Sequence, residues 1–196
     1  MDNNIIPSYN DVLSALNENF SDCPDIIMRK IYLKDGVEGY FIFIEGLVNF
    51  DLVQRDFISN ILSMSSEELC DENKVRTLPV SNIGFYYDIP SMVDKVLSGE
   101  FVFIFNGMGF AVSCILREFE KRAIEEPIVE KNIKGSHEGF VETLNINIAI
   151  LRRKIKNNNL KFKLLRVGTS SNQMVAIAYI QGIADQDILN HLYNKI

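Results

Sequence analysis

Apolar and polar residues follow two different periods along the chain, and each period predicts one kind of element. Residues 9–20 repeat apolar side chains at helical spacing, so we expect a helix there. Residues 26–46 read as two strands joined at Asp35-Gly36, a dipeptide suited to the positive φ angles of a tight hairpin turn. An amphipathic helix led by Asp51 is expected to follow.

A second helix and hairpin are expected before residue 117. Residues 89–99 keep helical spacing and end at Gly99, a residue that readily takes the left-handed conformation of a helix terminator. Residues 101–116 form two apolar runs separated by Asn-Gly-Met-Gly at 106–109, which predicts a second hairpin.

The order helix–hairpin–helix occurs twice in the chain. Residues 41–61 and 176–196 each contain an apolar strand, a glycine and an Asp-led amphipathic helix, and Gly46 aligns with Gly182 at an offset of 136. A helix and a hairpin precede the second copy as they precede the first. We therefore predict an α/β (α+β) fold of two small subdomains, built on this repeated unit with mixed sheets.

The second copy is shorter than the first, which sets the expected domain organisation. Residues 1–117 are predicted to form the first α/β subdomain, 118–137 an interdomain linker and 138–196 the second subdomain. Because the second copy stops after its Asp-led helix, one face or edge of its sheet would stay uncovered. We expect the chain to be a fragment that continues in a membrane domain, or to be completed by something else.

Composition narrows the class of protein. The longest apolar runs are far shorter than a membrane helix requires, and the N-terminus lacks the layout of a signal peptide, so we expect an unexported, soluble chain. Its three cysteines show no metal-type spacing and indicate a reducing compartment. The net charge of −6 is uneven, with −10 over residues 1–116 and +4 over 117–196. This asymmetry indicates two bodies with different surroundings.

Residues 122–153 are the most distinctive stretch of the chain, and their acidic residues and histidine are candidates for a reactive or metal site. Glu125, Glu126 and Glu130 are the residue type of a glycosidase or metal site, but no nucleophile, base or further ligand lies near them. They therefore indicate a solvated linker broken by Pro127. His137 is interpreted as a surface or capping residue. The sequence predicts no enzyme, no metal site and no cofactor.

A helix is expected from Ser136 to Lys156, followed by a basic strand. Its cations gather at the C-terminal end, as the helix dipole favours. The basic run 152–166 is a candidate for nucleic-acid binding, but a helix end and a strand with Lys161 and Lys163 facing water explain it, so we expect no nucleic-acid partner. Five apolar residues define the predicted buried face of the helix: Phe140, Leu144, Ile148, Leu151 and Ile155.

The same stretch resembles the signature of the GerA family, the A subunits of bacterial spore-germination receptors. That signature reads EEP, then E, then G-P-x-x-G-F-x-E and N-I-A-L-x-R; Ser136 departs from it, where the family usually has proline. The resemblance is strong over 118–196 and weaker but collinear over 1–117. The matching positions, interpreted as a linker and interdomain coupling, are Glu126, Pro127, Glu130, Gly135, Gly139, Phe140, Glu142, Asn147 and Arg152.

The resemblance implies a cytosol-facing N-terminal module of a receptor in the spore inner membrane. It implies B and C subunits and other copies of the A subunit as partners, with membrane attachment through segments absent here. Such a receptor responds to nutrients and triggers ion release. Two functions stay open: signalling and subunit assembly, or binding of a small nutrient or ion in the cleft between the subdomains.

Overall fold

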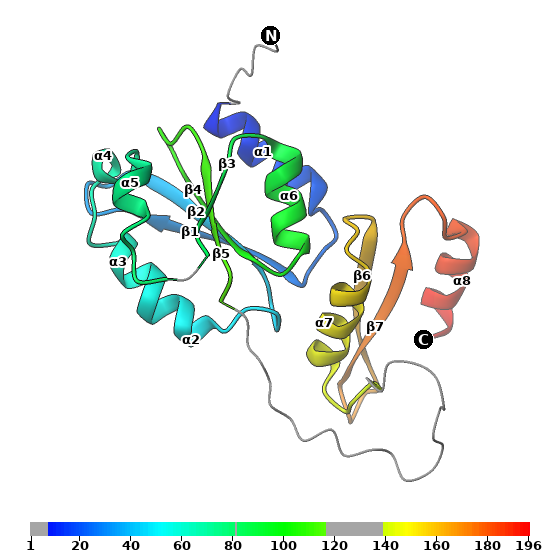
Figure 1. The fold of residues 1–196 in the computed structure, drawn as a ribbon. Helices are drawn as coiled ribbons and strands as arrows, with labels where there is room; N and C mark the ends of the chain where they lie inside the picture. Colours follow the sequence, from blue (N-terminus) through cyan, green and yellow to red (C-terminus); the bar gives the residue numbers. More distant parts are fainter. Residues whose placement is uncertain (1–7, 81, 117–138) are drawn as a thin grey trace, which may run out of the picture.

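The computed structural model describes residues 8–80, 82–116 and 139–196 (Figure 1). We call residues 8–116 the first half and residues 139–196 the second half. The helices are α1 (Tyr9–Asn19), α2 (Phe50–Leu52), a π-helix η1 (Val53–Ile58), α3 (Ser59–Ile61), α4 (Ser66–Leu69), α5 (Glu72–Val75), α6 (Ile89–Leu97), α7 (Leu144–Lys154) and α8 (Gln186–Lys195). The strands are β1 (Ile26–Tyr32), β2 (Glu38–Ile44), β3 (Gly84–Tyr86), β4 (Phe101–Phe105), β5 (Ala111–Cys114), β6 (Leu160–Val167) and β7 (Gln173–Ile180).

The first half is built on a five-stranded sheet in the order β1-β2-β4-β5-β3, and every strand pair in it is antiparallel. The predicted α+β fold with hairpins is confirmed, but the prediction of mixed sheets was wrong. Val102, at the start of β4, pairs with Ile42, near the end of β2. The helices between these strands therefore return the chain to the end of the sheet that it left, which makes the two neighbours antiparallel.

Helices cover both faces of this sheet because its central strands are apolar on both sides. In β2, Phe41 and Phe43 face one layer and Ile42 and Ile44 face the other, as the two-residue period of a strand requires. Figure 1 shows α1 and α6 on one face and α2 to α5 on the opposite face. The phenylalanine face packs against η1, where Phe57 is fully buried with its ring edge toward Phe41.

The second half is a β6-β7 hairpin with α7 before it and α8 after it, so the predicted repeat of helix–hairpin–helix is confirmed. Backbone angles and helix N-caps correspond between the two copies at the offset of 136. Gly46 and Gly182 follow the second strand of each copy with φ of 81° and 84°. The N-caps of the helices that follow are Asn49 and Asp185, again 136 residues apart. The prediction that Asp51 leads the first of these helices was wrong, because Asn49 accepts the capping hydrogen bond.

Helix α7 is shorter than expected, since it begins at Leu144 and not at Ser136. Residues 136–138 lie outside the described residues, and 139–143 are not helical. Within the predicted buried face, Ile148 is buried but Phe140 is 67% exposed. Asn147 explains the difference, because its side chain binds both backbone groups of Val141 and holds that residue out of the helix.

The second half is less covered than the first. In the first half Val53 and Phe57 of η1 are fully buried, whereas their repeat equivalents in α8, Leu189 and Tyr193, are partly or largely exposed. Among the described residues no strand pairs with the outer edge of β7. None of the helices in the described ranges combines the length and apolar character needed to cross a bilayer. The domain boundaries stay a prediction.

Candidate functional site

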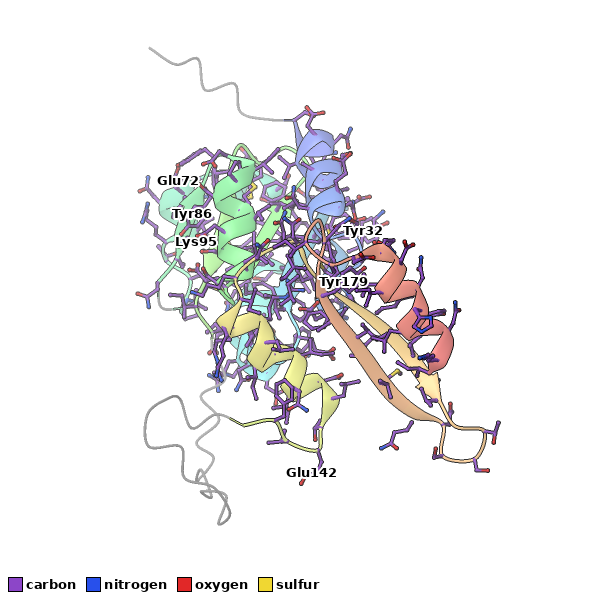
Figure 2. All side chains as sticks on the ribbon, turned by 90° about the vertical axis from the view of Figure 1, so that its right-hand side faces the viewer. Tyr32, Glu72, Tyr86, Lys95, Glu142 and Tyr179 are labelled. Carbon is purple, nitrogen blue, oxygen red and sulfur yellow. The ribbon has the colours of Figure 1, made fainter. Side chains whose placement is uncertain are left out.

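The structure describes five of the nine residues predicted for coupling. Gly139, Phe140 and Glu142 are exposed on the segment that leads into α7, and Figure 2 shows Glu142 pointing away from the molecule. Asn147 and Arg152 make defined contacts on α7. The other four lie outside the described residues: Glu126, Pro127, Glu130 and Gly135.

Arg152 forms the central contact between the two halves. Its Nε donates to Asp25 Oδ2 at 2.7 Å and its Nη2 donates to Asp25 Oδ1 at 2.8 Å, so the guanidinium and the carboxylate pair through two parallel hydrogen bonds. The partners are 127 residues apart. The Arg152 side chain is 0% exposed and that of Asp25 is 3% exposed. The pair is therefore almost wholly withdrawn from water.

The surroundings of Arg152 satisfy the rest of its guanidinium. Nη1 donates to the main-chain oxygen of Asn157 at 2.9 Å, at the turn that follows α7. The guanidinium carbon lies 5.1 Å from the centroid of the Phe162 ring, within the range of a cation–π contact. Because every side is occupied, the arginine holds α7, the start of β6 and the first half in one arrangement.

A second buried cation, Lys161, joins the halves beside the first. Its Nζ donates to the main-chain oxygens of Ser21 at 2.5 Å and Asn19 at 3.4 Å, and lies 3.6 Å from Cys23 Sγ. Asn19 ends α1, so the ammonium lies at the negative end of that helix dipole. The prediction that Lys161 faces water was wrong, since only 2% of it is exposed.

Two further contacts lie between the halves. Asn158 Nδ2 donates to Asn19 Oδ1 at 2.8 Å. Gly46, whose φ is positive, lies so near α7 that a Cβ added to it would stand 3.2 Å from Ala149 Cβ. We call this set, together with the Arg152–Asp25 and Lys161 contacts, the inter-half contact.

Sequence reasoning found one partner of this contact and missed the others. Arg152 came from the family signature, whereas Asp25 and Lys161 carry no local mark of pairing across more than 100 residues. The repeat held a signal, because Lys161 is the equivalent of Asp25 at the offset of 136. Asp25 directly precedes β1 and Lys161 is the second residue of β6, and each is buried against the opposite half.

The described residues contain no group of three or more histidine, cysteine or acidic side chains placed to hold a metal ion. A solvent-open depression of about 370 Å³ lies beside the inter-half contact and is lined in part by Asp22, Cys23 and Lys163. This depression is lined by residues of both halves, so it is the candidate place for a small molecule between them.

Comparison with known proteins gives a consistent result. Residues 14–196 match the family described as Bacillus/Clostridium GerA spore germination protein. From Bacillus subtilis, the Uncharacterized membrane protein YfkQ is 29% identical over all of this chain and 38% of its own length. Stage V sporulation protein AF, also from Bacillus subtilis, is 32% identical over 88% of this chain and 35% of its own length. The chain thus spans less than two fifths of each of these relatives.

A solved structure shows the same fold. The N-terminal domain of the A subunit of the Bacillus megaterium spore germinant receptor GerK3 aligns with a TM-score of 0.69 over 96% of this chain and 70% of that chain, at 21% identity. The fold match agrees with the family match, which covers the whole inter-half contact. The chain belongs to the GerA family of spore germination proteins.

Proposed function

We propose that this chain is the N-terminal module of a spore germinant receptor A subunit and that it acts in signalling and subunit assembly, without catalysing a reaction. Family membership and the shared fold support the identity of the module. In this proposal the module faces the cytosol at the spore inner membrane. Its partners are the B and C subunits and other copies of the A subunit.

The observation that carries the proposal is the buried Arg152–Asp25 pair. It connects two parts of the chain that are otherwise joined through the predicted linker, and it fixes their relative orientation. Two bodies with a defined, polar join can change orientation as units when a partner binds one of them. The signature residues then supply geometry to the receptor, in place of reactivity.

Ligand binding is the second candidate function. The depression beside Cys23 and Lys163 has the volume of a small-molecule site, but it is open to solvent, which favours weak binding. Titration of the purified chain with amino acids and inorganic ions, followed by amide NMR, tests it. Shifts confined to residues around Asp22 would support this function, and a flat titration would remove it.

Germination assays on the full-length receptor subunit test the main proposal. Arg152→Lys keeps a cation but loses the paired geometry of the guanidinium, so we expect slower germination with unchanged receptor level on an immunoblot. Arg153→Lys is the matched control, because it makes the same exchange at the exposed neighbour on the same helix. Wild-type germination in the Arg152→Lys spores would argue against a signalling role for the inter-half contact.

Gly139 offers a second test that is separate from folding. A Cβ added to Gly139 would meet no atom within 4 Å, and Gly139 does not have a positive φ. Gly139→Ala should therefore leave the fold intact and should not lower the unfolding free energy, which alanine can raise by up to about 1 kcal/mol because it narrows the unfolded ensemble. If this segment transmits a signal, the same change in the full-length subunit should slow germination, because alanine restricts the backbone of the connection.

A further inference from the structure

Asn147 binds the backbone of the segment that leads into α7. Its Oδ1 accepts a hydrogen bond from Val141 N at 2.8 Å and its Nδ2 donates to Val141 O at 2.7 Å. One amide side chain thus satisfies both backbone groups of one residue, as a neighbouring strand would do. Val141 lies directly after the exposed residues Gly139 and Phe140, where the chain enters the second half.

Asn147 and Arg152 lie on the same 11-residue helix, α7. Arg152 holds that helix to the first half through Asp25, and Ala149 lies against Gly46 of the first half. A helix of three turns is stiff, so a displacement at one anchor moves the other. Helix α7 therefore connects the point where the chain enters the second half to the inter-half contact.

We propose that Asn147 is a positioning residue, which fixes the entry of the chain onto α7 so that a pull on that entry reaches Asp25. The proposal rests on the proposed function, which it deepens by naming the path between the entering segment and the inter-half contact. A residue that only stabilised the fold would lower the amount of receptor. A positioning residue lowers the response of each receptor that is present.

Hydrogen exchange on the 196-residue chain is the first arm of the test. Asn147→Ala removes both hydrogen bonds, and we expect the Val141 amide to exchange roughly 30-fold faster, since two hydrogen bonds of ordinary strength are lost. Asn145→Ala is the matched control, because it removes an exposed asparagine from the same helix. Unchanged exchange at Val141 in Asn147→Ala would overturn the contact itself.

Spore germination by the full-length subunit is the second arm. We expect Asn147→Ala to slow germination several-fold per receptor, with receptor level equal to that of Asn145→Ala. Asn147→Asp keeps the acceptor for Val141 N but faces Val141 O with a carboxylate, so it should give an intermediate defect. If Asn147→Ala lowers the receptor level, germination per receptor in Asn147→Asp spores with a normal receptor level decides whether Asn147 has a positioning role.

The outcomes separate this proposal from the proposed function. Normal germination per receptor in both Asn147 variants, with faster exchange at Val141, would overturn the positioning role while leaving the Arg152 result intact. Normal germination in the Arg152→Lys spores would instead count against the proposed function. A defect in both sets supports one connected path through α7.

Discussion

Removing one partner of the buried Arg152–Asp25 pair should lower the free energy of unfolding far more than removing both. In Asp25→Ala the guanidinium of Arg152, 0% exposed, keeps the carbonyl of Asn157 and the ring of Phe162 but loses its only anion in the described part of the chain. A buried charge that has lost its partner destabilises the folded state strongly. Breaking such a pair costs about 3–5 kcal/mol.

The double variant sets the scale of the coupling. Leu16, the repeat equivalent of Arg152, is a fully buried leucine, so Arg152→Leu places at α7 the side chain that the first copy already uses. We expect Asp25→Ala/Arg152→Leu to lose only about 1–2 kcal/mol, because an apolar replacement of a buried pair is often close to neutral. Two single losses of about 3 kcal/mol each then give a coupling energy of about 4–5 kcal/mol.

Urea unfolding of the purified variants measures these losses of unfolding free energy. The chain has no tryptophan, so circular dichroism of the helices is the suitable signal. Asp56→Ala is the matched control, because Asp56 also receives two hydrogen bonds from one arginine, Arg55. The Arg55 side chain is 70% exposed, so Asp56→Ala should lower the free energy of unfolding much less than Asp25→Ala does. Additive single losses, or an Asp25→Ala loss as small as that of Asp56→Ala, would refute the buried-pair reasoning.

Two further predictions use positions that the repeat and the cysteines provide. Gly46→Ala should lower the free energy of unfolding by about 1 kcal/mol or more beyond the loss in Gly182→Ala. Both glycines have positive φ, but only at Gly46 does the new Cβ stand 3.2 Å from Ala149. Equal losses in urea unfolding would contradict this. Burial raises the pKa of the Cys114 thiol to about 12, so a thiol reagent at pH 8 should label exposed Cys70 at once and Cys114 only on unfolding. Because the folded pKa lies above the ordinary value of 9.0, stability should fall as pH rises above about 9, and Cys114→Ala should reduce that fall.

The hairpins and their turns could be predicted because their signals are local. At the first turn Gly36 takes a φ of 83° as predicted, whereas Asp35 does not take a positive φ; Gly99, the residue after the C-cap of α6, takes 80°. Strand alternation and helix spacing act over a few residues, so the sequence expresses them directly. The repeat was also visible, because a duplicated chain keeps its glycine and its N-cap at a constant offset.

The inter-half contact could not be predicted, because its partners are brought together by the fold alone. Arg152 looked like a cation at a helix end, which the helix dipole explains without a partner. Lys161 alternates with Phe162 as a surface residue of a strand does, yet the C-terminal end of α1 covers it. The start of α7 was misplaced for a related reason, since Asn147 competes for the backbone of Val141 with helical hydrogen bonding.

The polar character of the inter-half contact has a thermodynamic consequence. Separating the halves would return a carboxylate, a guanidinium and an ammonium to water, and water solvates all three well. Exposure of polar surface lowers the heat capacity, whereas exposure of apolar surface raises it. Opening this joint should therefore change the heat capacity little, and its equilibrium should vary gently with temperature, unlike that of a joint closed by leucines.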